Sequence, residues 1–177
     1  MRVRSERALA EGKHLRLYEV ELETDAGEIK HYELVRRHQA VMICALTARR
    51  EVILVEQFRV PAMTPTIEFP AGLCDVEGEE AEQTALRELE EETGYRAASA
   101  QLLHHGYSTA GMSDEYVYLF LASAAHEIAE PEEGITLHVV RLEDAIEFLM
   151  SKQQQGIALD YKTVPSLALV QRHLGCR

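Results

Sequence analysis

The nine residues 87–95 read RELEEETGY and hold four glutamates, one arginine and one glycine. They close a longer stretch, residues 79–93, that contains neither proline nor glycine and is rich in strong helix formers. The sequence therefore predicts a helix over 79–93, with Gly94 in the position where helices commonly end. The acidic run has two interpretations. It is either the solvent-exposed face of a charged helix or a group of carboxylates that forms a functional site.

The spacing of the glutamates favours a gathered site. At 100° per residue, Glu88, Glu91 and Glu92 share an arc of roughly 100°, and Glu90 lies on the other side of the helix. Like charges this close destabilise an isolated helix, whereas clustered carboxylates supply the oxygen ligands that hard divalent cations take. A solvated acidic helix is the alternative interpretation. An apolar face on the same helix, made of Ala81, Ala85 and Leu89, indicates instead that the helix packs against the protein.

Length and charge limit the classes of function. A chain of 177 residues predicts one domain, or one domain with a small appendage. The net charge of −12 disfavours nonspecific nucleic-acid binding, because such binding needs Lys and Arg to neutralise phosphates. Small phosphorylated ligands stay compatible with this charge when divalent cations accompany them.

Hydropathy and cysteine usage predict a cytoplasmic protein without a membrane segment. No apolar run approaches the roughly 18 residues of a membrane span, and the first residues, MRVRSERALAEGKH, lack the apolar core of a signal peptide. The three cysteines have no metal-ligand spacing, and a disulfide framework is not expected. Cys44 lies in an apolar run and is predicted to be buried.

The remaining pattern predicts a mixture of strands and helices. Alternating residues around the turn TDAGE predict a β-hairpin over about 15–36. Further strands are expected at 40–48, 51–60, 116–124 and 134–142, with a short strand in the proline-rich segment 61–72. Helices are expected at 142–155 and 163–174. Strands dominate the middle, with helices between and after them, which favours an α+β or α/β fold.

The span GLCDVEGEEAEQTALRELEEETGY, residues 72–95, resembles the signature of the Nudix hydrolases. That signature runs Gly, five residues, Glu, seven residues, then Arg-Glu-aliphatic-x-Glu-Glu-x-Gly-aliphatic. The match is complete from Glu79 to Gly94. One departure is that six residues separate Gly72 from Glu79, and the extra residue is expected to bulge outward in the loop CDVEG. The resemblance implies an α/β/α sandwich with a mixed sheet, an α+β fold, preceded by an N-terminal antiparallel β-hairpin domain.

Other segments are similar to the ADP-ribose pyrophosphatase branch of this family. They are VILVEQFRV followed by EFPAGL, STAGMSDEYVYLFLA, and EEGITLHVVRLEDA. Nucleoside diphosphate sugar hydrolases, including GDP-mannose hydrolases, share nearly all of these features. The resemblance implies hydrolysis of ADP-ribose to AMP and ribose 5-phosphate, with GDP-mannose or another nucleoside diphosphate sugar as the second candidate. A Nudix-fold nucleotide-binding module without turnover is the alternative from another class.

The branch also implies a domain arrangement and an assembly. Residues 1–38 would form an N-terminal β domain, and residues 39–177 the Nudix hydrolase domain. In this branch the N-terminal domain is often exchanged between the subunits of a dimer, so a homodimer is expected.

By the same resemblance, the carboxylates of Glu88, Glu91 and Glu92 and the carbonyl of Ala71 are expected to bind Mg²⁺, with Mn²⁺ as an alternative ion. Oxygen ligands suit both ions. Arg87 is expected to orient a carboxylate, that of Glu79, rather than to touch the substrate.

The resemblance points to further residues in loops and at strand ends. Glu133 is the first candidate for the general base, with Glu115 and the neighbouring Glu132 as alternatives. Arg36 and Arg59 match positions where the branch holds basic residues near the diphosphate or nucleotide. A guanidinium suits either contact, because it can bind phosphate through two hydrogen bonds or stack on a base. Ordinary salt bridges are the alternative role for these two arginines.

Overall fold

The computed structural model describes residues 1–13 and 15–176. These residues form two compact units. The smaller unit contains Met1–Gln39 and Gly106–Val117, and the larger unit contains Ala40–His105 and Tyr118–Arg177. The predicted domain division after residue 38 stays a prediction.

The smaller unit is built on a three-stranded antiparallel sheet of order β1-β2-β3. Its strands are β1 (Arg2–Glu11), β2 (Arg16–Glu23) and β3 (Ile29–Arg36). The hairpin predicted over 15–36 is confirmed as β2 and β3, paired from Arg16 with Arg36 to Glu23 with Ile29. β1 was not predicted. Every one of its residues is exposed, so no buried face marks it as a strand in the sequence.

The segment 106–117 joins this small sheet through the backbone. The amide of Val35 donates to the carbonyl of Met112 (2.9 Å), and the amide of Asp114 donates to the carbonyl of Val35 (3.3 Å). Val35 and Ser113 thereby form a parallel bridge. These contacts bring residues from two distant parts of the sequence into the same unit.

The larger unit contains most of a nine-stranded mixed sheet, whose main path runs β12-β6-β5-β4-β10-β8. β11 pairs with β5, β7 with β4, and β9 with β10. The bounds are β4 (Ala40–Thr47), β5 (Glu51–Arg59), β6 (Thr64–Glu68), β7 (Ala71–Leu73), β8 (Tyr95–Arg96), β9 (Ala100–Tyr107), β10 (Tyr116–Glu127), β11 (Thr136–Arg141) and β12 (Ala158–Leu159). β12 runs parallel to β6.

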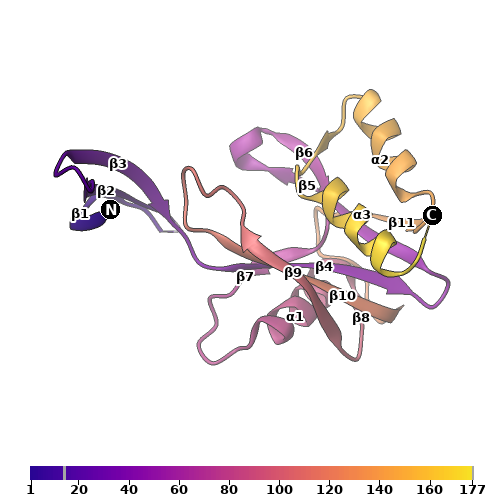
Figure 1. Cartoon of the computed structure of the whole chain (residues 1–177). Coiled ribbons are helices and arrows are strands. Elements are labelled where there is room, and N and C mark those ends of the chain that lie inside the picture. Colours follow the sequence, from indigo (N-terminus) through magenta and orange to yellow (C-terminus); the bar gives the residue numbers. More distant parts are fainter. Residues whose placement is uncertain (14, 177) are drawn as a thin grey trace. The chain divides into compact units, whose positions relative to one another are not determined.

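Three helices cover the two faces of this sheet. α1 (Ala81–Thr93) lies on one face, and α2 (Ala145–Gln154) and α3 (Thr163–His173) lie on the other (Figure 1). The predicted α/β/α arrangement with a mixed sheet is therefore confirmed, as are all three predicted helices. Within the described residues, no helix combines the length and the apolar character needed to span a membrane.

The core explains why two strands are continuously apolar. The interior residues of β4 and residues 52–55 of β5 are buried on both faces, as expected for strands with helices on each side. Val41, Ile43 and Ile53 pack in one cluster with Ala85 and Leu89 of α1. The apolar face predicted for the acidic helix is thus buried, and it fixes the direction in which the helix presents its glutamates.

Candidate active site

The first turn of α1 is fixed by a capping box. Glu80 is the N-cap residue, and its amide donates to Oε1 of the Gln83 side chain (2.9 Å). The helix begins at Ala81, two positions after the predicted start, because Glu80 is the N-cap residue and Glu79 lies before it. At the other end Gly94 has φ 70°, and its amide donates to the carbonyl of Glu90. The predicted role of Gly94 in ending the helix is confirmed.

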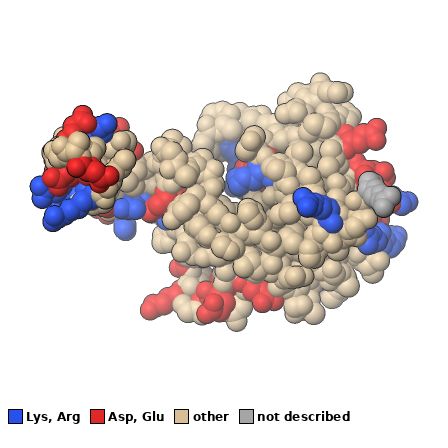
Figure 2. All heavy atoms as spheres, viewed as in Figure 1, with Lys and Arg blue, Asp and Glu red and all other residues tan. Residues whose placement is uncertain are grey.

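The glutamates of α1 separate by face as the helical spacing predicts. Glu92 is buried, the Glu88 side chain is 15% exposed, and the Glu91 side chain is 56% exposed at the edge of the group. Glu90 points elsewhere and pairs with Arg96 at 2.6 Å. Acidic side chains also gather over the loop that leads from β7 into α1 (Figure 2).

Arg87 connects three of the carboxylates. Its Nε and Nη2 donate to the two oxygens of Glu79 at 3.1 and 3.2 Å. Its Nη1 donates to Glu88 at 2.7 Å and to Glu91 at 2.8 Å. The expected contact with Glu79 is present, and Thr84 also donates to Glu79 at 2.8 Å. The hydrogen bond from Arg87 is the main reason that the pKa of Glu79 is lowered.

Glu92 is held apart from Arg87 by two other donors. Gln57 of β5 donates from Nε2 to Oε1 at 3.2 Å, and the amide of Ala71 in β7 donates to Oε2 at 3.1 Å. Burial nevertheless raises the pKa of Glu92 to about 7. The two donors therefore orient the carboxylate, but they do not offset the free-energy cost of burying its charge, because two neutral donors do not replace the hydration that burial removes.

Gly72 allows a close approach between β7 and α1. A Cβ atom added at Gly72 would lie 2.1 Å from the Cδ atom of Glu88, so the Glu88 carboxylate packs where a side chain would stand. The extra residue in the following loop leaves this contact in place. Residues 75–78 are all exposed, which agrees with an insertion that bulges outward.

The residues fit a hard divalent cation by their chemistry. Every proposed donor is an oxygen, and burial raises the pKa of Glu88 as well as that of Glu92. A cation beside them would offset this unfavourable burial. Among residues 1–13 and 15–176, however, no three His, Cys, Asp or Glu side chains stand close enough together to hold an ion. To bind a cation, Glu88 and Glu91 would give up their hydrogen bonds with Nη1 of Arg87 and contact the ion instead. Glu79 would keep its hydrogen bonds with Nε and Nη2 of Arg87.

The raised pKa of Glu92 predicts a pH-dependent metal affinity. An ion binds the deprotonated carboxylate, so a proton must leave whenever Glu92 is protonated. We expect the Mg²⁺ affinity to fall as the pH drops below about 7. Calorimetric titration of Mg²⁺ at pH 6 and pH 8, in buffers of different ionisation enthalpy, should detect proton release at pH 6 that is reduced at pH 8. Equal affinity and no proton release at pH 6 would contradict the assignment of Glu92.

The first candidate base lies in a loop that is tied to α1. The amide of Glu132 donates to the carbonyl of Glu92 at 3.3 Å, and the amide of Ile135 donates to the carbonyl of Glu132 at 3.1 Å. Glu133 stands between these two anchored positions with an exposed side chain. The loop is thus attached to the end of the helix that carries Glu92, while Glu133 itself is left in contact with solvent.

Glu115, the second candidate base, belongs to the smaller unit. Its carboxylate pairs with Arg37 at 2.9 Å and accepts a short hydrogen bond from Ser108. These contacts fix its orientation within the segment 106–117.

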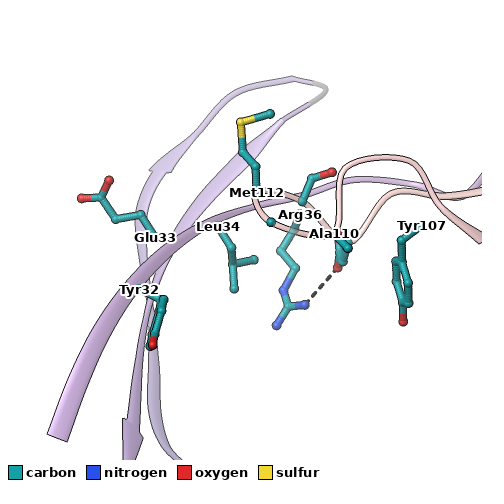
Figure 3. A pocket seen from close by; sticks show the side chains of 10 residues that line it. Tyr32, Glu33, Leu34, Arg36, Tyr107, Ala110 and Met112 are labelled. Atoms are coloured by element: carbon teal, nitrogen blue, oxygen red, sulfur yellow. Dashed lines mark hydrogen bonds and ion pairs between the residues drawn. The ribbon is translucent and has the colours of Figure 1, made fainter. Parts of the chain in front are cut away.

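Arg36 also belongs to the smaller unit, where it lines a pocket of about 320 Å³. Its Nη1 donates to Asp114 at 2.9 Å, its Nη2 donates to Glu6 at 2.7 Å, and its guanidinium lies 5.8 Å from the ring centroid of Tyr18. Figure 3 shows Arg36 in this pocket with Tyr32 on one side and Tyr107 on the other. Ion pairing, the alternative weighed for Arg36, is present. A substrate contact stays a prediction.

Arg59 is in the larger unit, at the end of β5, and pairs with Glu68 of β6 at 2.6 Å. Burial would lower the pKa of Arg59, but the hydrogen bond and charge of Glu68, with the charges of Glu92 and Asp160, raise it. Arg59 thus forms an ion pair, which was its alternative role, but its partner Glu68 is a buried carboxylate.

Further polar residues that the sequence did not predict surround these groups. They are Gln57, Glu68, Asp160 and Lys162. Asp160 follows β12, and its amide donates to the carbonyl of Ile67 in β6 (3.0 Å). The only indication of this network in the sequence was the presence of polar residues, such as Gln57 and Glu68, within segments that have a strand pattern. Their partners depend on strand pairing, which the pattern alone does not reveal.

Comparison with known proteins agrees with this arrangement. A family model described as NUDIX domain matches residues 36–161. The chain is 36% identical over 165 residues to an ADP-ribose pyrophosphatase of Bacillus subtilis, covering 90% of this chain and 86% of the relative. It is 30% identical over 175 residues to a GDP-mannose pyrophosphatase of Yersinia pestis, covering 90% of this chain and 85% of the relative. A crystal structure of an ADP compounds hydrolase has a TM-score of 0.83 at 23% identity, covering 98% of this chain and 94% of that chain.

The chain belongs to the Nudix hydrolase family, since the family model covers most of its length. It is an enzyme of that family, a pyrophosphohydrolase homologous to ADP-ribose pyrophosphatases. The likeness to the solved structure supports the fold alone. The family generally uses a divalent metal, which agrees with the oxygen donors gathered on α1.

Proposed function

We propose that this chain hydrolyses the diphosphate link of ADP-ribose, giving AMP and ribose 5-phosphate, with Mg²⁺ as the cofactor and Mn²⁺ as an alternative. The observation that carries the proposal is the geometry of α1. Arg87 binds Glu79, Glu88 and Glu91, while Gln57 and Ala71 hold Glu92 separately. The relative from Bacillus subtilis, which bears the name ADP-ribose pyrophosphatase, supports the choice of substrate.

In this proposal, Glu88, Glu91, Glu92 and the carbonyl of Ala71 hold the metal. When bound, divalent ions neutralise the charge of the diphosphate and lower the pKa of a water molecule. Arg87 keeps Glu79 in place through Nε and Nη2, so its contribution is to orient the acidic group rather than to contact the substrate.

Other residues act on the water and the substrate. Glu133 accepts the proton of the attacking water, with Glu115 as the alternative base. Attack at phosphorus forms a new P–O bond to the water oxygen and breaks the P–O bond to the bridging oxygen, which leaves on the second phosphate. Arg36 and Arg59 bind the phosphates or the nucleotide.

Hydrolysis of GDP-mannose is the second candidate, supported by the named relative from Yersinia pestis. A binding module without turnover is disfavoured, because the chain keeps each carboxylate of the signature together with its partners. A homodimer with an exchanged N-terminal domain and a cytoplasmic location both stay predictions.

A substrate panel tests the proposal. Phosphate release from ADP-ribose, GDP-mannose and UDP-glucose would be measured after phosphatase treatment of the products, with Mg²⁺ and with EDTA. We expect cleavage of ADP-ribose to exceed that of the other two by about tenfold or more, which corresponds to about 1.4 kcal/mol, and to vanish in EDTA. A preference for GDP-mannose would move the assignment to the second candidate. Absence of turnover with every substrate would favour the binding module.

A further inference from the structure

The strand geometry places Arg59 on the same face of the sheet as the group that holds Glu92. Residues two apart in a strand point to the same side, so Gln57 and Arg59 share one face of β5. Gln57 contacts Glu92 on that face. Glu56, the residue before Gln57, points to the opposite face, where it pairs with His138 at 2.8 Å.

The position of Glu68 determines where the Arg59 guanidinium lies. In the antiparallel pairing of β5 with β6, Glu68 stands opposite Val55, whereas Arg59 stands opposite Thr64. The side chains of Arg59 and Glu68 must therefore extend toward each other along the sheet, across the level of Gln57, to meet at 2.6 Å. Without this contact, a side chain at the end of β5 would be free to extend into solvent.

The contact uses only one edge of the guanidinium. Nε of Arg59 donates to Oε1 of Glu68, and within the described residues neither Nη1 nor Nη2 has a hydrogen-bond partner. The Nη groups supply four of the five N–H donors of an arginine. Two such donors side by side match a pair of phosphate oxygens.

Asp160, another acidic residue near Arg59, does not compete with Glu68 for its guanidinium. Asp160 accepts hydrogen bonds from the amide of Lys162 and from its Nζ, both at 2.8 Å. Glu68 is thus the carboxylate that holds Arg59. It is also the more buried member of the pair, with a side chain 9% exposed against 40% for Arg59. Burying a carboxylate carries a desolvation penalty that an exposed ion pair would avoid.

We propose that Glu68 is a positioning residue, which holds Arg59 by Nε so that its two Nη groups face the diphosphate of the substrate beside Glu92. This inference rests on the proposed function for the substrate class and deepens it. Glu68 does not touch the substrate, and its whole effect passes through Arg59.

A double-mutant cycle tests this relation, with ADP as the diphosphate probe. The four proteins are the wild type, Glu68→Gln, Arg59→Ala and the double variant, each titrated calorimetrically with ADP in the presence of Mg²⁺. Glu68→Gln keeps the size and an acceptor oxygen but removes the charge. We expect it to weaken ADP binding about tenfold in the wild type, and less than about twofold when Arg59 is absent, since coupled residues show non-additive effects.

Glu56→Gln is the matched control, because it makes the same chemical change in the neighbouring strand β5, on the other face of the sheet. It should alter ADP affinity less than about twofold, and thermal melts should establish that every variant is folded. Equal losses from Glu68→Gln in both backgrounds, an unchanged ADP affinity in Glu68→Gln, or no ADP binding by the wild type would overturn the proposal. Because ADP binding needs no turnover, failure to hydrolyse ADP-ribose would count against the proposed function alone.

Discussion

Replacing Glu92 by glutamine is expected to lower kcat/KM for the diphosphate substrate about 1,000-fold while the fold is retained. A metal ligand contributes several kcal/mol of charge stabilisation in the transition state, and each 1.36 kcal/mol corresponds to a factor of ten. The variant keeps the shape of the side chain. Its amide oxygen can still accept from Ala71, and Gln57 can satisfy its amide nitrogen by rotating its own amide.

The same variant should be at least as stable as the wild type when no metal is present. The folded-state pKa of Glu92 is raised by burial from 4.5 to about 7, so the charged form is disfavoured in the folded protein. The wild type accordingly loses stability as the pH rises from about 4.5 through 7, and glutamine does not. At pH 8 in EDTA we expect Glu92→Gln to raise Tm by about 5 °C.

Opposite changes in activity and stability would distinguish a metal ligand from a structural residue. Turnover and thermal melts would be measured on the same preparations. Addition of Mg²⁺ should raise the Tm of the wild type by binding to the folded state, with a smaller rise in Glu92→Gln. A variant that is both less stable in EDTA and fully active would contradict the role given to Glu92.

Replacing Gly72 by alanine is expected to lower kcat/KM about 100-fold with a small effect on folding. The new Cβ would stand 2.1 Å from the Cδ of Glu88, so the end of this side chain must move. A displacement of about 1 Å in a catalytic arrangement can reduce the rate by about two orders of magnitude. Because the clash involves a flexible side chain rather than backbone, the helix can stay in place.

Gly106→Ala is the matched control for this substitution. Apart from Gly106 and its two chain neighbours, no residue has a heavy atom within 4 Å of the Cβ position at Gly106, and its φ is not positive. Its kcat/KM should stay within about twofold of the wild type, as expected for a substitution that disturbs no contact. If Gly72→Ala were as active as Gly106→Ala, the close packing of Glu88 against β7 would have no catalytic importance.

The face of α1 could be predicted because helical periodicity is a local property. The angles between Glu88, Glu91 and Glu92 follow from the rise and turn of any α-helix, and Ala85 and Leu89 fix which side faces the core. The continuous apolar runs of β4 and β5 likewise identified strands with both faces covered. These features need no knowledge of distant contacts.

The polar network around the helix could not be predicted in the same way. The contact between Gln57 and Glu92, and that between Arg59 and Glu68, depend on which strands pair and in what register. The strand β1 was missed for a related reason. Its exposed residues show no alternation of buried and exposed positions, so only pairing with β2 reveals it.

Two predicted site residues fall in a unit that the sequence did not define. Arg36 and Glu115 belong to the smaller unit because residues 106–117 pair with β3 rather than simply linking β9 to β10. Their local partners, Asp114 for Arg36 and Arg37 for Glu115, are charged residues from the other segment of that unit. Opposite charges brought together by folding are not visible as a pattern along the chain.

The proposed chemistry requires that the carboxylates of α1 hold a divalent cation. Mn²⁺ would be titrated into the wild type and into Glu92→Gln, and the free ion would be followed by electron paramagnetic resonance. We expect the wild type to deplete the free Mn²⁺ signal and the variant to bind at least about tenfold more weakly, since loss of even an indirect ligand contact weakens metal binding by this factor. Equal Mn²⁺ binding by the two proteins, or no binding by the wild type, would contradict it.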